Sequence, residues 1–419
     1  MTKKKILMLC DHPLSTSGVG TQARYLISGL VDTGKYSFRV LGGAIRHESY
    51  ETVAVNPDFI IKPIDGFGDP NMIRVLLATE RPDALMLFTD PRFFFHIFSH
   101  EDEIHQICPI VYNHLWDQCE FAPLYNKVIY DSVDLLNCIN RPTYDFLKSL
   151  YPEDKFPGKV NWTPHALPKQ LFFPLSKDEQ LATKRKLFNR SDDEFVVLWV
   201  NRNARRKNPG DVLWSWKQFL DLLEQKHGHK KATLVMHTDP FDPEGPNLAA
   251  LVEMLNIKDR VIFSKDRTSF QDMNKLYNAC DTVINFSCAE GFGLATLEAM
   301  YCGKPIIAVK TGGLERQVVD YRDGSENGIA LHVEYKTLVG SQMVPGIVED
   351  HVTNESKAKA LLHMFELGDE NRRQLGQKAM NYAHEEFDMG RLIQTWDTTL
   401  EDTIANWKQR DSRWEVVKF

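Results

Sequence analysis

Short apolar runs and amphipathic segments alternate along most of this chain. Apolar runs rich in β-branched residues predict strands at 5–10, 84–88, 110–112, 195–200, 232–236, 261–264, 282–286 and 306–309. Segments with helical spacing of apolar residues predict helices at 21–30, 210–223, 270–279 and 294–301. Continuously apolar strands alternating with helices are typical of parallel sheets covered on both faces. The sequence therefore predicts an α/β fold with two Rossmann-like, doubly wound domains.

The pattern changes between 151 and 191, where prolines are frequent and apolar residues lose their period. This change predicts a crossing between an N-terminal domain, 1–175, and a C-terminal domain, 190–391. The tail from 391 onward contains Trp396, Trp407 and Trp414 among helix-forming residues. Because a free tail needs few aromatic residues, we expect it to pack on one of the domains.

Two glutamates flank a glycine turn that opens the helix predicted at 294–301. Glu290 lies in the turn and Glu298 about one helical turn further along. Gly291 and Gly293 let the backbone approach a ligand where the helix N-terminus favours negative charge. Carboxylates accept hydrogen bonds, so they suit the paired hydroxyls of sugars and riboses. Either glutamate taken alone would be read as an ordinary loop or helix residue.

The sequence EGFGLATLEAM, followed by GKPIIA and GGLE, resembles the E-x7-E signature of retaining GT-B glycosyltransferases of the GT4-type family. The resemblance implies two domains facing each other across a cleft, with 392–419 completing the first. It also implies contacts with the donor sugar and phosphates from Glu290 and from the backbone of Gly291, Phe292, Gly293 and Leu294. By the same resemblance Glu298 holds the ribose, and Gly312 and Gly313 approach the diphosphate.

A basic loop follows the strand at 195–200 and contains Arg202, Arg205, Arg206 and Lys207. Such cations could neutralise the charge that builds on a departing diphosphate, the role of a divalent metal in other transferases. The family's Arg-x4-Lys pair matches Arg202 and Lys207, which we favour over Arg205 and Arg206. A solvated basic loop is the plainer alternative. Since the chain has no Asp-x-Asp motif, we expect neither a metal nor any cofactor beyond the nucleotide-sugar co-substrate.

The remaining candidates are distributed over both domains. Gly18 and Gly20 precede a helix and could approach a phosphate or the acceptor. His114 follows the strand at 110–112, where ligands bind in open α/β sheets, and could hydrogen bond a sugar hydroxyl. Trp116 and Asp117 are weaker acceptor-side candidates. Asp266 and Arg267 lie in the loop where relatives hold the nucleobase.

Composition narrows the class of protein further. The 419 residues are 43% apolar and 26% charged, with a formal net charge of −7, which argues against a globally basic nucleic-acid binder. The apolar run Ile6 to Cys10 is too short for a signal peptide or a membrane span, so we expect a cytoplasmic protein without an integral span. Seven cysteines without metal-binding spacing indicate reduced thiols.

Taken with the resemblance, these features predict a retaining, metal-independent glycosyltransferase. A UDP-sugar is the favoured donor and a GDP-sugar the next. The acceptor hydroxyl could belong to a glycan, a lipid, a small molecule, a protein or a modified nucleic-acid base. The alternatives are a GT-B epimerase or phosphorylase acting on related substrates, and a non-catalytic pseudo-transferase that binds a partner.

Overall fold

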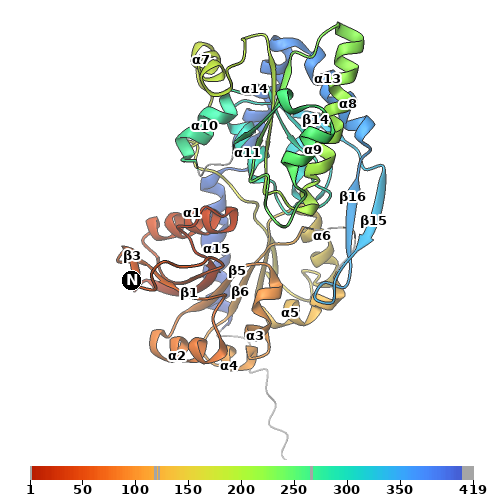
Figure 1. Cartoon of the computed structure of the whole chain (residues 1–419). Coiled ribbons are helices and arrows are strands. Elements are labelled where there is room, and N and C mark those ends of the chain that lie inside the picture. Colours follow the sequence, from red (N-terminus) through yellow and green to blue (C-terminus); the bar gives the residue numbers. More distant parts are fainter. Residues whose placement is uncertain (1, 118–119, 121–122, 265–267, 408–419) are drawn as a thin grey trace, which may run out of the picture. The chain divides into compact units, whose positions relative to one another are not determined.

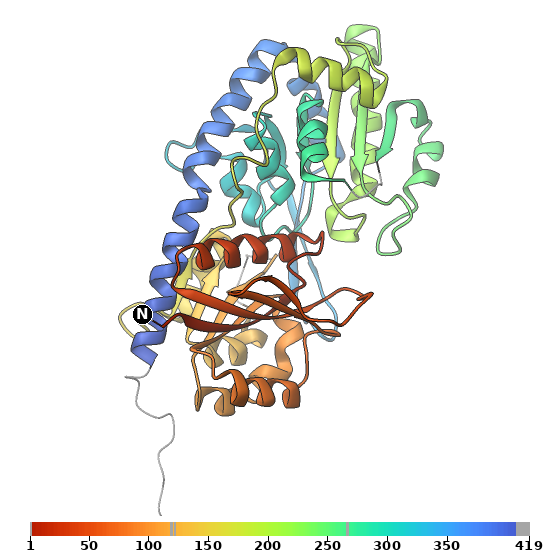
Figure 2. The same ribbon diagram turned by 90° about the vertical axis from the view of Figure 1, so that its left-hand side faces the viewer.

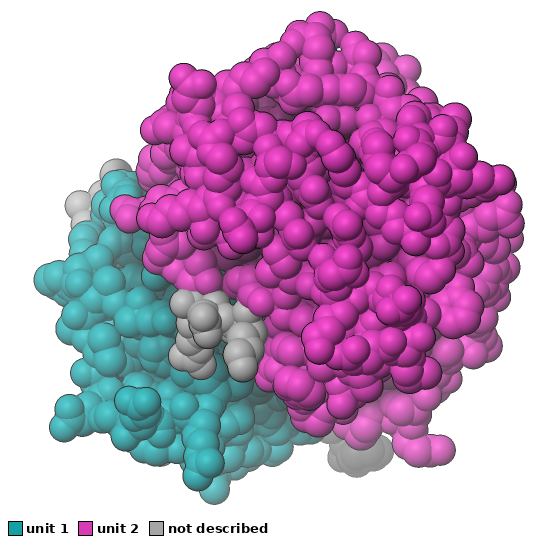
Figure 3. Space-filling model, turned by 45° about the horizontal axis from the view of Figure 1, so that its top comes forward, with its two compact units in different colours: residues 1–116, 121–166, 389–419 teal, residues 117–120, 167–388 magenta. Residues whose placement is uncertain are grey.

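A computed structural model of the chain describes residues 2–117, 120, 123–264 and 268–407. It divides into two compact units, coloured separately in Figure 3. Unit 1 comprises Met1–Trp116, Phe121–Ala166 and Met389–Phe419, and unit 2 comprises Asp117–Glu120 and Leu167–Asp388. Apart from the short segment Asp117–Glu120, the chain passes between the units after Ala166, inside the segment 151–191 where the sequence places the crossing, and returns after Asp388, close to the expected return at 392.

Unit 1 is built on an eight-stranded sheet with the strand order β3-β4-β2-β1-β5-β6-β7-β8. Its strands are β1 (Lys4–Asp11), β2 (Tyr36–Gly43), β3 (Val53–Asn56), β4 (Phe59–Pro63), β5 (Ala84–Thr89), β6 (Ile110–His114), β7 (Leu135–Cys138) and β8 (Val160–Trp162). All neighbouring strands run parallel except β3, which pairs with β4 in the antiparallel sense. The sheet has the doubly wound form that the sequence predicts.

Helices cover both faces of this sheet. They are α1 (Gly18–Asp32), α2 (Pro70–Glu80), α3 (Phe95–Phe98), α4 (Glu101–His105), α5 (Lys127–Ser132), α6 (Arg141–Leu150) and α15 (Met389–Trp407). Alternate side chains of β1 point to opposite faces: Ile6 and Met8 join the core under α1 and α15, and Leu7 joins the core under α2 to α6. Both faces of β1 are therefore apolar and buried.

The last helix, α15, belongs to unit 1, where Figure 2 shows it in blue beside the red N-terminal elements. It packs against α1, and Trp396 is 2% exposed within the core of unit 1. Ile393 lies so close to Gly29 of α1 that a side chain at Gly29 would overlap it. This return of the chain to the first unit agrees with the fold that the family resemblance implies. Trp414 lies outside the described residues.

Unit 2 contains a six-stranded parallel sheet with the order β11-β10-β9-β12-β13-β14 (Figure 1). Its strands are β9 (Phe195–Val200), β10 (Ala232–His237), β11 (Val261–Ser264), β12 (Thr282–Asn285), β13 (Ile306–Val309) and β14 (Gly328–Leu331). Its helices are α7 (Lys177–Phe188), α8 (Pro209–His227), α9 (Leu248–Met254), α10 (Phe270–Asn278), α11 (Leu294–Tyr301), α12 (Glu315–Val318), α13 (Asn354–Glu366) and α14 (Gly368–Glu386). The helix α8 packs against α13, and α11 against α14. The predicted fold class is confirmed in both units.

Two features differ from the sequence prediction. The proline-rich segment contains the strand β8 and the helix α7, which begins with a capping box between Ser176 and Glu179. An antiparallel hairpin of β15 (Tyr335–Val339) and β16 (Ile347–His351) follows β14. Within the described residues, no helix is long and apolar enough to cross a membrane.

Candidate functional site

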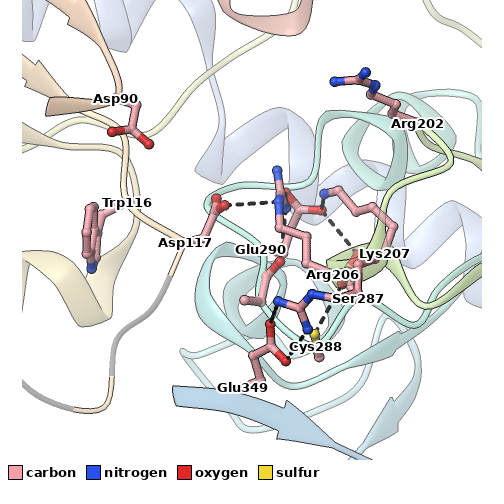
Figure 4. A network of polar contacts seen from close by, with 12 residues as sticks. Asp90, Trp116, Asp117, Arg202, Arg206, Lys207, Ser287, Cys288, Glu290 and Glu349 are labelled. Carbon is pink, nitrogen blue, oxygen red and sulfur yellow. Dashed lines mark hydrogen bonds and ion pairs between the residues drawn. The ribbon is translucent and has the colours of Figure 1, made fainter. Parts of the chain in front are cut away.

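Charged side chains gather at the carboxyl edge of the sheet in unit 2 (Figure 4). The turn at 205–207 follows β9, the loop at 287–290 follows β12, and the turn at 310–313 follows β13. Because these strands are parallel neighbours, their carboxyl ends meet at one edge, where ligands bind in open α/β sheets. Segments that are about a hundred residues apart in the sequence are thereby brought into contact.

The centre of this site is a buried ion pair between Lys207 and Glu290, each residue being 7% exposed. The ammonium of Lys207 donates to Oε2 of Glu290, and Asn285 Nδ2 donates to the same oxygen at 3.4 Å. Burial alone would raise the pKa of Glu290, but the charges of Lys207 and Arg206 outweigh it and hold this pKa below its usual value. Glu290 is therefore an ionised carboxylate within a positively charged environment.

Arg206 is the second cation beside Glu290. Its Nη1 donates to the carbonyl oxygen of Ala289 at 3.1 Å and lies 4.0 Å from Oε1 of Glu290. Its Nε lies 3.2 Å from a carboxylate oxygen of Asp117, and its own carbonyl accepts from the N–H of Cys288. The Arg-x4-Lys spacing did not select Arg206. Its position directly before Lys207 was the only signal in the sequence that could have indicated it.

Arg202 lies apart from this cluster. Its guanidinium donates to Asp242 at 2.7 and 3.2 Å and lies 3.2 Å from Glu244, and 59% of its side chain is exposed. The two carboxylates hold the Arg202 side chain away from Glu290. The cations beside Glu290 are therefore Lys207 and Arg206, and Arg202 is not among them. A role for Arg202 at the diphosphate stays a prediction.

The glycine turns pack directly against one another. The N–H of Gly313 donates to the carbonyl of Glu290 at 2.9 Å, and a Cβ on Gly313 would lie 2.4 Å from the Cα of Phe292. Gly293 has a φ of +90° and precedes Leu294, the first residue of α11. The structure thus brings 290–294 and 312–313 together as predicted, and only glycine permits this distance between the two turns.

Glu298, in the middle of α11, is partly buried and accepts a hydrogen bond from the hydroxyl of Tyr277 at 2.6 Å. Burial raises the pKa of Glu298 to about 7, and the bond from Tyr277 offsets only part of that effect. It has no contact with Glu290 among the hydrogen bonds of the described residues. The two glutamates therefore have different environments, as expected if they serve different parts of a ligand.

The hairpin supplies site contacts that the sequence did not indicate. Glu349 of β16 accepts two hydrogen bonds from Arg205, at 2.9 and 2.6 Å. The N–H of Asp350 donates to the carbonyl of Cys288, and its carboxylate accepts from Thr311 at 2.7 Å. The base of the hairpin is thereby bonded to all three segments that form the site.

In unit 1, the structure gives His114 two tyrosine partners. The imidazole is fully buried, with Nε2 3.0 Å from the Tyr130 hydroxyl and Nδ1 3.3 Å from the Tyr112 hydroxyl. Burial lowers the pKa of His114 to about 3, so the ring is neutral. A role for His114 at a sugar hydroxyl stays a prediction.

The other candidates of unit 1 also have structural contacts. Gly18 is the first residue of α1, and a Cβ on Gly20 would lie 2.5 Å from the carbonyl oxygen of His12. Gly20 is thus required by the loop that packs on it, whether or not a ligand binds. Trp116 is 5% exposed, and its carbonyl accepts from Asn140.

Asp117 belongs to unit 2 and meets Arg206, as described above. Asp266 and Arg267, expected near the nucleobase, lie outside the described residues. Among the residues that the structure describes, no three His, Cys, Asp or Glu side chains form a group that could hold a metal ion.

Part of this chain resembles a known protein family and several curated proteins. Residues 182–334 match the family model described as Glycosyl transferases group 1. The chain is 30% identical over 181 residues to the D-inositol 3-phosphate glycosyltransferase of Stackebrandtia nassauensis, a match that covers 43% of this chain and 39% of that protein. The matched region thus spans less than half of that relative's length. These findings confirm the family resemblance for the segment that carries the site.

Solved structures match over nearly the whole chain. The sucrose-phosphate synthase of Thermosynechococcus elongatus aligns with a TM-score of 0.75 at 16% identity, over 96% of this chain and 100% of that one. The Anabaena protein Alr3699/HepE, solved in complex with UDP-glucose, aligns with a TM-score of 0.69 at 17% identity, over 95% and 99%. At such identities the likeness establishes the two-domain fold.

Proposed function

We propose that this chain, whose residues 182–334 form a glycosyl transferases group 1 domain, transfers a sugar from a nucleotide-sugar donor to an acceptor hydroxyl. The observation that carries the proposal is the cluster of Arg206, Lys207 and Glu290 at the carboxyl edge of the sheet in unit 2. Two cations match a diphosphate, and the carboxylate between them matches sugar hydroxyls.

The glycine turns support the placement of the donor. Their backbone comes close to Glu290 at the N-terminus of α11, where N–H groups and the helix dipole favour an anion. In the proposal the diphosphate lies between this N-terminus and the cations, and Glu298 holds the ribose. A UDP-sugar is the first donor to test, because the matching Anabaena protein was solved with UDP-glucose, and a GDP-sugar is the second.

The reaction we propose retains the configuration at the anomeric carbon. The bond from that carbon to the diphosphate oxygen breaks, and the acceptor oxygen bonds to the same carbon from the same face. The acceptor proton passes to the departing phosphate oxygen, so no protein base is needed. Arg206 and Lys207 stabilise the charge that develops on the diphosphate, and no metal is required.

The test is to incubate the whole chain with UDP- and GDP-sugars and with hydroxyl acceptors of each class, and to measure release of the nucleoside diphosphate. NMR of the product then reports the anomeric configuration, and a chelator tests the metal requirement. We expect activity that Lys207→Met abolishes and that Lys359→Met, at an exposed lysine of α13, leaves unchanged.

Four outcomes would contradict parts of this proposal. Inverted product refutes the retaining mechanism, and loss of activity with the chelator refutes metal independence. Conversion of the donor into another sugar nucleotide without an acceptor would instead indicate an epimerase. Full activity of Lys207→Met would show that the proposed donor site is wrong.

A further inference from the structure

Unit 2 contains a cavity at the amino ends of the strands of its sheet, opposite to the site described above. Its volume is about 740 Å³. Phe195, Asp281 and Pro305 line it, each at or directly before the first residue of β9, β12 or β13. The helices α7, α10 and α14, labelled in Figure 1, supply further lining residues from 177–184, 278 and 368–377. A cavity of this size accommodates a small metabolite.

Three cations with little exposed surface line this cavity. Lys184 is 4% exposed and Lys304 is 7% exposed, and the side chain of Arg372 is 12% exposed. One carboxylate lies among them: Asp281 is 3.2 Å from Lys184 and 3.8 Å from Arg372. Three positive charges and one negative charge leave an excess of two positive charges in a region with little water.

The other acidic residues of the lining do not offset this excess, because each has a cation of its own. Asp192 pairs with Arg185, Asp193 with Lys231, Glu194 with Arg260, and Asp369 with Lys177. Of these partners only Lys177 belongs to the lining. These pairs therefore leave the excess positive charge of Lys184, Lys304 and Arg372 in place.

The hydrogen bonds of the cations leave donors available. The ammonium of Lys304 donates to the side-chain oxygen of Gln180 and to the carbonyl of Asn278, both at 2.9 Å, which engages two of its three protons. Arg372 donates through Nη1 to two carbonyls at the end of α13, and its Nη2 lies 3.8 Å from Asp281, which is too far for a hydrogen bond. Neutral oxygen atoms thus accept some of the hydrogen bonds of Lys304 and Arg372, and the positive charge of both side chains remains.

We propose that this cavity binds a phosphate monoester. A phosphoryl group carries close to two negative charges and three acceptor oxygens, which matches the excess charge and the remaining donors of Lys304 and Arg372. The rest of the cavity, lined by polar groups such as Gln180 and Gln377, has room for a hydroxylated body such as a sugar. The inference does not depend on the proposed transferase activity, because it rests on residues at the other edge of the sheet.

The test uses the whole chain with inorganic phosphate and glucose 6-phosphate as probes, measured by calorimetry at constant ionic strength. Gln180→Glu is the informative variant, because it adds a carboxylate beside Lys304 without removing a hydrogen-bond acceptor. We expect this variant to weaken binding of the sugar phosphate at least about tenfold. Glu355→Gln, at an exposed residue of α13, is the control and should bind normally.

Because the site around Lys207 and Arg206 could also attract phosphate, Arg206→Gln is measured in parallel. The proposal is supported if Arg206→Gln binds the sugar phosphate normally and Gln180→Glu binds it more weakly. It is overturned if Gln180→Glu binds as well as the unchanged protein, or if Arg206→Gln alone loses binding. Equal affinity for inorganic phosphate and glucose 6-phosphate would overturn the sugar-phosphate assignment and leave a phosphate site.

Discussion

Replacing Glu298 by Gln should stabilise unit 2 in a way that depends on pH. The ordinary pKa of 4.5 applies to the unfolded chain, and burial raises it to about 7 in the folded protein. The folded state therefore binds this proton more tightly, so the stability of the unchanged protein falls as pH rises from 4.5 to about 7. Each unit of pKa corresponds to about 1.4 kcal/mol, so the loss of stability above pH 7 is at most about 3 to 4 kcal/mol.

This value is an upper limit because water reaches part of the residue. Glutamine can accept the same bond from Tyr277 but cannot ionise. The increase in unfolding free energy caused by Glu298→Gln should thus be below about 1 kcal/mol near pH 5. Near pH 8 it should approach the upper limit given above. The free energy of unfolding is measured in urea, with hydrogen exchange in peptides from α10 and α11 as the probe. These peptides belong to unit 2, so the measurement reports the stability of that unit alone.

Glu355→Gln, at an exposed residue of α13, provides the control. A gain of equal size at both pH values would mean that burial of the Glu298 charge is not the cause, and a loss at pH 8 would refute the reasoning. In its proposed role at the ribose, the carboxylate must be ionised to accept two hydroxyl protons. UDP should accordingly bind the unchanged protein more tightly at pH 8 than at pH 6, and Glu298→Gln should show a smaller difference, because only the ionisation of the UDP phosphate then remains.

The remaining predictions concern both units. Lys207→Met should cost about 3–5 kcal/mol of unfolding free energy in urea, because it leaves the Glu290 charge buried, and adding Glu290→Gln should restore most of it without restoring activity. Arg206→Gln should lower kcat at least about tenfold and Arg202→Gln by less than about threefold, and the reverse order in steady-state kinetics would favour the Arg-x4-Lys assignment. Trp396→Ala should destabilise unit 1 by about 3–5 kcal/mol through the cavity it leaves, and an unchanged urea transition would contradict the packing of α15.

The strands of unit 2 were predictable because their apolar runs are bounded by polar or turn-forming residues. The strands β9 and β13 begin and end at the predicted residues. The helix α7 escaped prediction for a physical reason: its buried residues are only Lys184 and Phe188, and its start depends on a capping box rather than on an apolar stripe. Hydrophobic periodicity reports burial, so it fails where a helix is largely exposed.

At the site, the sequence indicated which segments come together but not where each side chain points. The family resemblance assigned both Lys207 and Glu290 to the donor site, and the structure brings them together because β9 and β12 are neighbours in the sheet. The sequence could not give the direction of Arg202, which depends on two carboxylates about forty residues away, Asp242 and Glu244. Nor could it show that His114 points into the core, because the tyrosines that surround it come from β6 and α5.

The charges at the site are balanced before any donor binds. Arg206 faces Asp117, and Lys207 faces Glu290, so two cations meet two carboxylates. If a diphosphate binds in this cluster, as we propose, it replaces carboxylates as the partner of these cations and does not leave Lys207 unpaired. In the same proposal Glu290, once released, accepts hydroxyl protons from the sugar. The proposed donor would thus replace the contact between Lys207 and Glu290, which would couple recognition of the diphosphate to recognition of the sugar.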